Sequence, residues 1–250
     1  MAERLEIVRK KIDTACQRSG RSRSEVRLIG VAKGQPKERL YEAVQSGLLD
    51  IGENYAQEMV NHWGALRLED VTPKSRAHPA APLHPIEWHF LGHLQRNKVK
   101  QILPLTSVIH SVDSPGLVDE IDKQAGKTGK IQAVLIEVNL GGEKSKSGIK
   151  IGAHQGTPLQ EMVLAMNGYD HISLQGFMTL PPFSEDPEKT RPYFRQLREI
   201  RDEINEKRHY KSLLGHLSMG MTNDFEVAIE EGATMVRIGT GIFGMRETKK

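Results

Sequence analysis

The chain has 250 residues, which is long enough to bury one large core without disulfides or metal ions. Its formal net charge is +3, from 35 Lys and Arg against 32 Asp and Glu, with the two signs interspersed. This pattern excludes a basic nucleic-acid-binding tail, so we expect no nucleic-acid partner. No apolar run approaches the roughly 18 residues of a membrane helix, and no apolar signal region opens the chain. We expect a soluble, cytoplasmic monomer with no membrane partner.

The first predicted element is an amphipathic helix, in which Leu5, Val8, Ile12 and Ala15 recur at helical spacing. Cys16 lies on the same apolar side, which favours a packed thiol over a reactive one. It is the only cysteine. The chain therefore cannot form an internal disulfide, as suits a reducing cytosol.

Eight short β-rich apolar runs follow this helix, and helical patterns separate them. Such alternation is typical of a parallel sheet with crossover helices. We predict one α/β domain over residues 1–250, a (β/α)8 TIM-type barrel with an extra N-terminal helix. A doubly wound open sheet is the alternative. The predicted strands are Val26–Ala32, Asp50–Glu53, Trp88–Leu91, Ser107–Val112, Ile131–Asn139, Ile172–Met178, Gly215–Ser218 and Thr234–Ile238.

Two of the intervening helices have clear boundary signals. One is predicted to begin at Ser114, before a proline, and to close near Gly126. The other is predicted to have Asn223 as its N-cap, because Glu226 follows three residues later. Gly232 should end it.

The segment Leu68–Glu87 breaks the alternation, because it places four prolines among small and polar residues. It predicts a surface loop insertion between the second helix and the third strand. Four histidines lie in or near this segment, and their spacings match no metal-ligand pattern, so we predict no metal site. They are His78, His84, His89 and His93.

Lys33 directly follows the first predicted strand. Barrels of this kind bind ligands where their strands end, so this ammonium group is placed at the expected edge. A strand-end lysine is commonly a solvated edge residue. In a low-dielectric site, however, a lysine loses its proton more readily and becomes an amine that can form a Schiff base.

A candidate anion site follows the eighth predicted strand, in the segment Arg237–Gly241. Gly239 and Gly241 would let backbone N–H groups approach an anion, and Thr240 adds a hydroxyl. Barrels often bind phosphate after strands seven and eight. Ser218 supplies a second hydroxyl on the same side. The alternative is an ordinary glycine-rich turn.

Six segments together carry a family resemblance: Asp50–Asn54, Trp88–Lys98, Lys144–Gly148, Gln175–Thr179, Leu217–Asp224 and Gly232–Thr240. In this order they resemble the pyridoxal phosphate homeostasis proteins, the YggS/PROSC family of fold-type III barrels. The resemblance runs from about Val26 to Gly244. It implies a fold like the alanine racemase N-terminal domain and a role in intracellular pyridoxal 5'-phosphate homeostasis.

Carried over by residue, the resemblance implies that Lys33 holds pyridoxal 5'-phosphate as a Schiff base. It implies that Ser218, Gly239 and Thr240 hold the phosphate and that Arg237 faces the pyridine nitrogen. The resemblance also places Asn54, Met178 and His89 around the ring. For Asn54 and Met178 the alternative is packing, and for His89 it is a strand-end position with its hydrogen bonds satisfied.

Arg237 also bears on what the protein does. A guanidinium keeps its proton near neutral pH, so it would donate to an unprotonated pyridine nitrogen and leave the ring a poor electron sink. We therefore predict holding of the cofactor and its delivery to apo pyridoxal-phosphate enzymes, without turnover and without catalytic residues. The alternative is a fold-type III amino-acid racemase, which needs a base opposite Lys33. A third possibility is a barrel enzyme for another phosphate ester, with Lys33 as its catalytic amine.

Overall fold

The computed structural model describes residues 1–66, 86–142, 147–150 and 158–245. Nearly all of the predicted insertion 68–87 lies outside the described residues, as do His78 and His84. The same holds for the first three residues of the Lys144–Gly148 segment.

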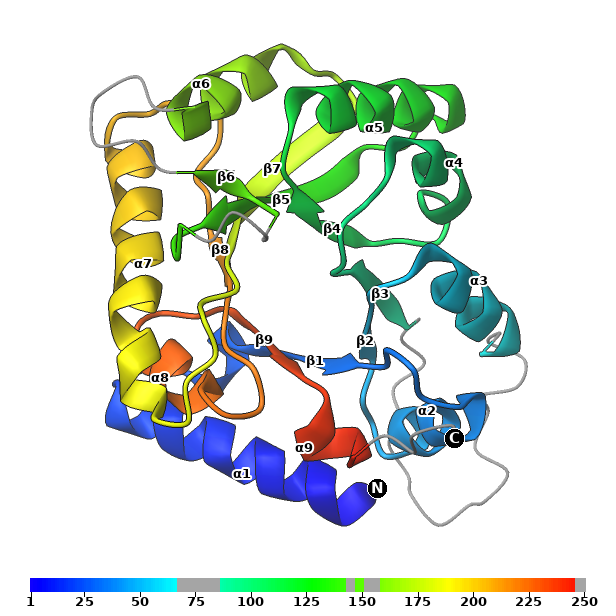
Figure 1. Cartoon of the computed structure of the whole chain (residues 1–250), viewed down its shortest axis with the longest axis vertical. Coiled ribbons are helices and arrows are strands. Elements are labelled where there is room, and N and C mark those ends of the chain that lie inside the picture. The colour runs from blue at the N-terminus through cyan, green and yellow to red at the C-terminus, as the bar shows by residue number, and fades with distance from the viewer. Residues whose placement is uncertain (67–85, 143–146, 151–157, 246–250) are drawn as a thin grey trace.

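Eight parallel strands close into a barrel, and Figure 1 looks into their ring. Each strand pairs with the next one along the chain, the last pairs with the first, and β4 pairs with β5 to complete the circle. The TIM-type barrel is confirmed, and the open sheet is excluded. The strands are β1 (Arg27–Val31), β2 (Asp50–Glu53), β3 (Glu87–Phe90), β4 (Val108–Val112), β5 (Gln132–Asn139), β7 (Ile172–Met178), β8 (His216–Ser218) and β9 (Met235–Ile238).

All eight predicted strands are present, with bounds that agree to within one residue. One further strand was not predicted, β6 (Ile149–Lys150), which pairs with the end of β5 outside the barrel. Two residues are too few to show an alternation of apolar and polar side chains, so the sequence carries no signal for it.

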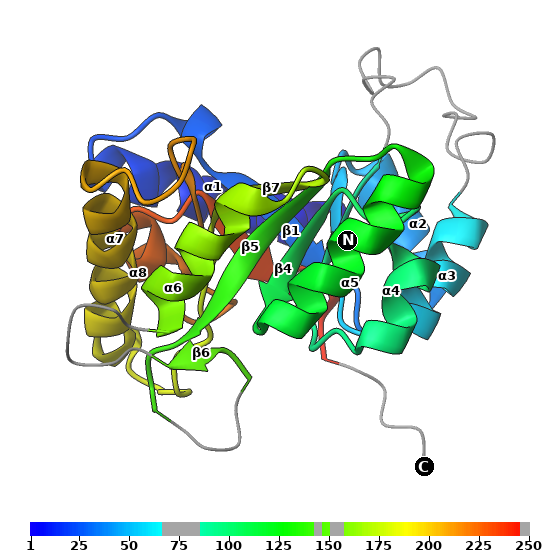
Figure 2. The same ribbon diagram turned by 90° about the horizontal axis from the view of Figure 1, so that it is seen from above.

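Helices surround the barrel (Figures 1 and 2). Short 3-10 turns are η1 (Arg23–Glu25), η2 (Arg96–Lys98), η3 (Met166–Gly168) and η4 (Pro187–Thr190). None of the helices in the described part of the chain combines the length and the apolar character needed to cross a membrane. The α-helices are α1 (Ala2–Arg18), α2 (Lys37–Gln45), α3 (Ala56–Ala65), α4 (Val99–Ile102), α5 (Pro115–Thr128), α6 (Pro158–Ala165), α7 (Arg191–Glu206), α8 (Phe225–Glu230) and α9 (Thr240–Phe243).

The extra N-terminal helix α1 packs against α8 and α9, next to the strands that close the barrel. Its predicted apolar side is buried, and Cys16 is 1% exposed. The prediction of a packed thiol is therefore confirmed. A second apolar cluster lies inside the barrel, because alternate side chains of a strand point to opposite faces. Its buried members are Ile29, Leu91, Val108, Leu135, Met178 and Met235.

One predicted helix end is two residues short, and one predicted N-cap is wrong. Helix α5 continues past Gly126 to Thr128, and Gly129 is its C-cap, with a left-handed φ of 65°. Helix α8 has Asp224 as its N-cap residue rather than Asn223. The Asn223 amide instead donates to the Ser184 carbonyl oxygen at 2.9 Å, so this side chain ties two loops together.

Candidate functional site

Lys33 lies two residues beyond the end of β1, at the C-terminal edge of the barrel, as predicted. Its side chain is half-buried, and Nζ lies 4.9 Å from the centroid of the Tyr55 ring. A cation at this distance is attracted by the face of the ring. The following N–H, of Gly34, donates to Glu58 Oε2 at 2.9 Å. The start of α3 therefore positions the loop that carries Lys33.

Arg237 is the third residue of β9, and only 4% of it is exposed. One guanidinium nitrogen, Nη1, donates to Ser218 Oγ at 2.6 Å, and Nη2 donates to the Thr179 carbonyl oxygen at 2.9 Å. Burial lowers the pKa of Arg237 to about 10, although Asp224 and Glu137 oppose the shift. The guanidinium therefore keeps its charge near neutral pH and is held by the ends of two neighbouring strands.

Ser218 is the last residue of β8 and is fully buried. Its hydroxyl contacts both the Arg237 guanidinium and His110 Nδ1, the latter at 2.9 Å. Among the described hydrogen bonds, the hydroxyl of Thr240 pairs with a different residue, Thr222, at 3.2 Å. The structure thus brings Ser218 to Arg237, and it brings Thr222 to the predicted anion site.

Thr222 is the residue that sequence reasoning missed at this site. Its Oγ1 also accepts from the N–H of Gly241 at 3.3 Å, so it links the loop after β8 to the first turn of α9. Gly239 precedes that turn and is half-buried, and Thr240 opens the turn and is exposed. The signal was a hydroxyl side chain four residues beyond Ser218, within one of the segments that carry the family resemblance.

His89 lies inside the barrel rather than at its rim, and it is fully buried. Its Nδ1 lies 2.9 Å from His110 Nε2, and its Nε2 lies 3.0 Å from Asp50 Oδ1. Burial, and after it the nearby charge of Arg237, lowers the pKa of His110 well below its usual value. Among the described residues, no three His, Cys, Asp or Glu side chains come together as metal ligands.

Met178 and Asn54 have different surroundings. Met178 is 1% exposed and belongs to the apolar cluster inside the barrel, which fits the packing alternative. Asn54 follows β2, and its Oδ1 is buried with no hydrogen-bond partner among the described residues. A buried acceptor without a partner costs free energy, so this oxygen is available to a ligand.

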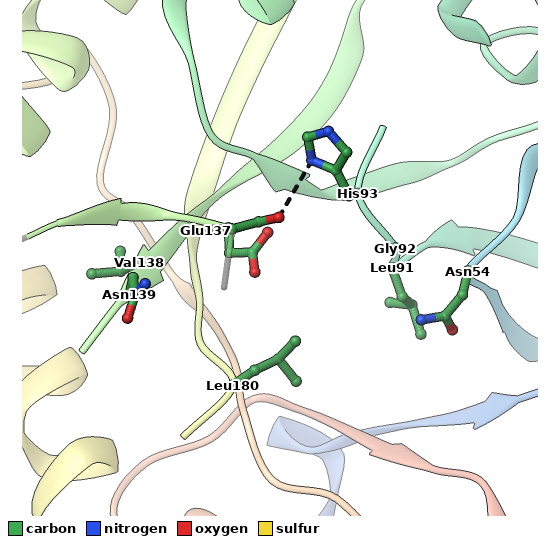
Figure 3. Close-up of a pocket in the computed structure, with 9 residues that line it drawn as sticks. Asn54, Leu91, Gly92, His93, Glu137, Val138, Asn139 and Leu180 are labelled. Atoms are coloured by element: carbon green, nitrogen blue, oxygen red, sulfur yellow. Dashed lines mark hydrogen bonds between the residues drawn. The ribbon is translucent and has the colours of Figure 1, made fainter. Parts of the chain in front are cut away.

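A cavity of about 200 Å³ opens beside Asn54 at the barrel mouth (Figure 3). Glu137 faces it from the end of β5 and is only 6% exposed. Burial, with a contribution from Asp113, raises the pKa of Glu137 to about 7, against the opposing charges of Arg237 and His93. The lining residues are Asn54, Leu91, Gly92, His93, Glu137, Val138, Asn139, Ser147 and Leu180.

Glu137 was also missed, although an acidic residue inside an otherwise apolar strand was a visible signal. His93 stands near it, with Nδ1 3.1 Å from Asp113 Oδ2 and 3.4 Å from Ser147 Oγ. The mouth thus holds a titratable carboxyl group that is poised near neutral pH.

The chain is a barrel with a lysine after β1 and a buried arginine on the adjoining β9. This class of barrel includes the family described as "Alanine racemase, N-terminal domain", whose model matches residues 9–247. A pyridoxal phosphate homeostasis protein from Aquifex aeolicus (strain VF5) is 44% identical over 245 residues, covering 98% of each chain. The chain therefore belongs to the alanine racemase N-terminal domain family and, within it, to the pyridoxal phosphate homeostasis proteins.

Two solved structures are similar to the chain over nearly its whole length. An unknown protein from Bifidobacterium adolescentis is 34% identical, with a TM-score of 0.81 over 96% of this chain and 93% of that one. PipY of Synechococcus elongatus PCC7942, solved with PLP bound, is 30% identical, with a TM-score of 0.76 over 97% and 99% of the two chains.

Proposed function

We propose that this protein binds pyridoxal 5'-phosphate at the barrel mouth, holds it as a Schiff base on Lys33, and serves its intracellular homeostasis. One observation carries the proposal. The adjoining strands β2, β1 and β9 are followed, in that spatial order, by Asn54, by Lys33 and by the Gly239–Thr240 turn. The relatives named for this role, and PipY with PLP bound, support it.

The residues at the barrel mouth suit each part of pyridoxal 5'-phosphate. The Lys33 amine can condense with an aldehyde, and the inward guanidinium of Arg237 can donate to a ring nitrogen. We assign the phosphate to Gly239 and Thr240, and we add Thr222 because its hydroxyl adjoins Thr240. Hydroxyls and backbone N–H groups at a turn of this kind favour an anion.

The other residues predicted to bind the cofactor differ in how well their contacts support that role. Asn54 would line the ring with its partnerless Oδ1. Met178 and His89 are buried, and their observed contacts support packing and an internal hydrogen bond. Ser218 was predicted to bind phosphate. Its contact with Arg237 supports a role in holding the guanidinium instead.

We infer that the bound group is held and passed on to apo enzymes, without turnover. When bound, the group supplies an electron-withdrawing ring, and a guanidinium at its nitrogen weakens that withdrawal. The racemase alternative is favoured by one observation, which is Glu137 at the mouth with a pKa of about 7, a value that suits a general acid or base.

The test is spectroscopic. The purified protein should show a visible band typical of an imine, and borohydride should fix the group on Lys33 in peptide mass mapping. An adduct on another lysine would contradict the site. Racemisation or decarboxylation of an amino acid at roughly 1 per second or more would promote the alternative. Transfer of the group to an added apo enzyme would support the delivery role.

A further inference from the structure

A chain of four hydrogen bonds crosses the barrel interior from one end to the other. Arg237 Nη1 donates to Ser218 Oγ at 2.6 Å, and Ser218 Oγ lies 2.9 Å from His110 Nδ1. His110 Nε2 lies 2.9 Å from His89 Nδ1, and His89 Nε2 lies 3.0 Å from Asp50 Oδ1. Ser218, His110 and His89 are each fully buried. No other atoms are needed to complete the chain.

When both histidines are neutral, the chemistry of the two ends sets the direction of every bond. A guanidinium can only donate, so the Ser218 oxygen accepts from Arg237 and its own hydrogen is left for His110 Nδ1. His110 then carries its proton on Nε2 and donates to His89 Nδ1. His89 in turn carries its proton on Nε2 and donates to Asp50, whose carboxylate can only accept. One tautomer of each histidine therefore satisfies the whole chain.

The surroundings favour a neutral His110. If His110 gained a second proton, its Nδ1–H and the Arg237 guanidinium would both donate to Ser218 Oγ. The Ser218 hydrogen would then lose its acceptor. Burial first, and after it the charges of Arg237 and Arg27, disfavours a positive charge on His110. A buried charge without a partner is costly, whereas a fully satisfied buried network rigidifies its members.

The chain joins the two ends of the barrel. Asp50 opens β2, at the N-terminal end, where Arg27 Nη1 lies 3.4 Å from Asp50 Oδ1. Ser218 ends β8, at the C-terminal end, where ligands of such barrels bind. The Thr179 carbonyl oxygen holds the other nitrogen of the guanidinium, so Arg237 is fixed from two sides.

We propose that Asp50, His89, His110 and Ser218 form a one-directional hydrogen-bond relay that positions the Arg237 guanidinium toward its ligand, with both histidines neutral and protonated on Nε2. The four are positioning residues. Their link to a ligand rests on the proposed function, whereas the direction of the relay does not.

The direction is tested by nitrogen NMR on histidine-labelled protein at pH 7, without added ligand. We expect His89 and His110 each to show an unprotonated Nδ1 and a protonated Nε2. A proton on Nδ1 of either ring, or on both nitrogens, would overturn the relay. In the same sample, a slowly exchanging Nη1–H signal of Arg237 should be present, and a separate sample of Ser218→Ala should lack it.

The effect on the ligand is tested with two variants at one position. His110→Asn keeps an acceptor near the place of Nδ1, and His110→Leu removes it. We expect His110→Leu to bind pyridoxal 5'-phosphate on the order of tenfold more weakly, with a shifted absorption maximum, and His110→Asn to recover most of both.

Circular dichroism and thermal melting separate loss of fold from loss of positioning. A folded His110→Leu protein with wild-type affinity and spectrum would overturn the positioning role. If wild-type protein bound no pyridoxal 5'-phosphate, the proposed function would fail. The histidine tautomers and the Arg237 signal would still decide whether the relay exists and holds the guanidinium.

Discussion

The Nζ atom of Lys33 lies 4.9 Å from the centroid of the Tyr55 ring, so a residue that precedes α3 holds the amine that follows β1. The two residues belong to neighbouring strand-to-helix loops, and Tyr55 is 52% exposed. The amine therefore stands at the mouth, on an aromatic face that is itself open to solvent. It is placed to meet a ligand and contributes little to the core.

Replacing Lys33 with alanine should leave the protein folded and abolish the covalent adduct. The side chain is only half-buried, so the melting temperature should change little. Lys37→Ala, which changes an exposed lysine of α2, is the matched control and should keep the adduct. Borohydride reduction followed by peptide mass mapping checks both variants. An adduct that survives in Lys33→Ala would reject the assignment.

Thr222→Val should weaken binding of pyridoxal 5'-phosphate by about 1 to 3 kcal/mol, because a hydrogen bond to a charged group is lost. It should leave the binding of pyridoxal, which has no phosphate, unchanged. Ser218→Ala should weaken both ligands alike, because it acts through Arg237. Thr14→Val is the control, since that hydroxyl donates to the Lys10 carbonyl oxygen on α1. Titration by absorbance measures all three variants.

The opposite pattern would return Ser218 to the phosphate. If Ser218→Ala weakened only the phosphorylated ligand and Thr222→Val weakened neither, the hydroxyl of Thr222 would have a structural role alone.

Glu137→Gln should flatten the dependence of stability on pH between about pH 5 and 8. The pKa of this carboxyl is raised from 4.5 to about 7 in the folded protein. Its stabilising contribution is therefore fully present below pH 4.5 and is lost as the pH rises through 7. As the pH rises across this interval, the free energy of unfolding of the variant should increase relative to that of wild type by up to about 3 kcal/mol.

Denaturant unfolding at several pH values measures this difference. Glu206→Gln makes the same change of charge at an exposed position of α7 and should follow wild type. A constant difference between Glu137→Gln and wild type would show that Glu137 does not titrate in this interval.

Gly176→Ala should destabilise the barrel by about 2 to 4 kcal/mol. Gly176 has a φ of 156°, and a Cβ there would lie 1.9 Å from the backbone oxygen of His216 on β8. The register between β7 and β5 also shifts beside it. Gly64→Ala, in α3, meets nothing within 4 Å and should raise stability by up to about 1 kcal/mol. Equal melting temperatures for the two variants would contradict the steric argument.

The order of the elements and the place of Lys33 were predictable because both depend on neighbours along the chain. Apolar runs and helical patterns alternate, and a lysine after the first run must lie at a strand end. The helix boundaries near Gly126 and Asn223 were less well predicted, because each residue type permits a helix boundary without requiring one. In the structure α5 runs on to Thr128, and the Asn223 amide bonds to the loop at Ser184 instead of capping α8.

By itself, then, the sequence determined the succession of eight strands and their helices and the candidate residues at the strand ends, whereas the closure of the sheet into a barrel was decided by the tertiary structure. Only the tertiary structure paired Ser218 with His110, which is 108 residues away, placed Thr222 beside Thr240, and buried Glu137 at the mouth. These pairings depend on how far each strand is shifted along its neighbour and on which residues then meet inside the ring. The alternation of side chains along a strand shows which residues share a face. It does not show how that strand is aligned with strands that are remote in the chain.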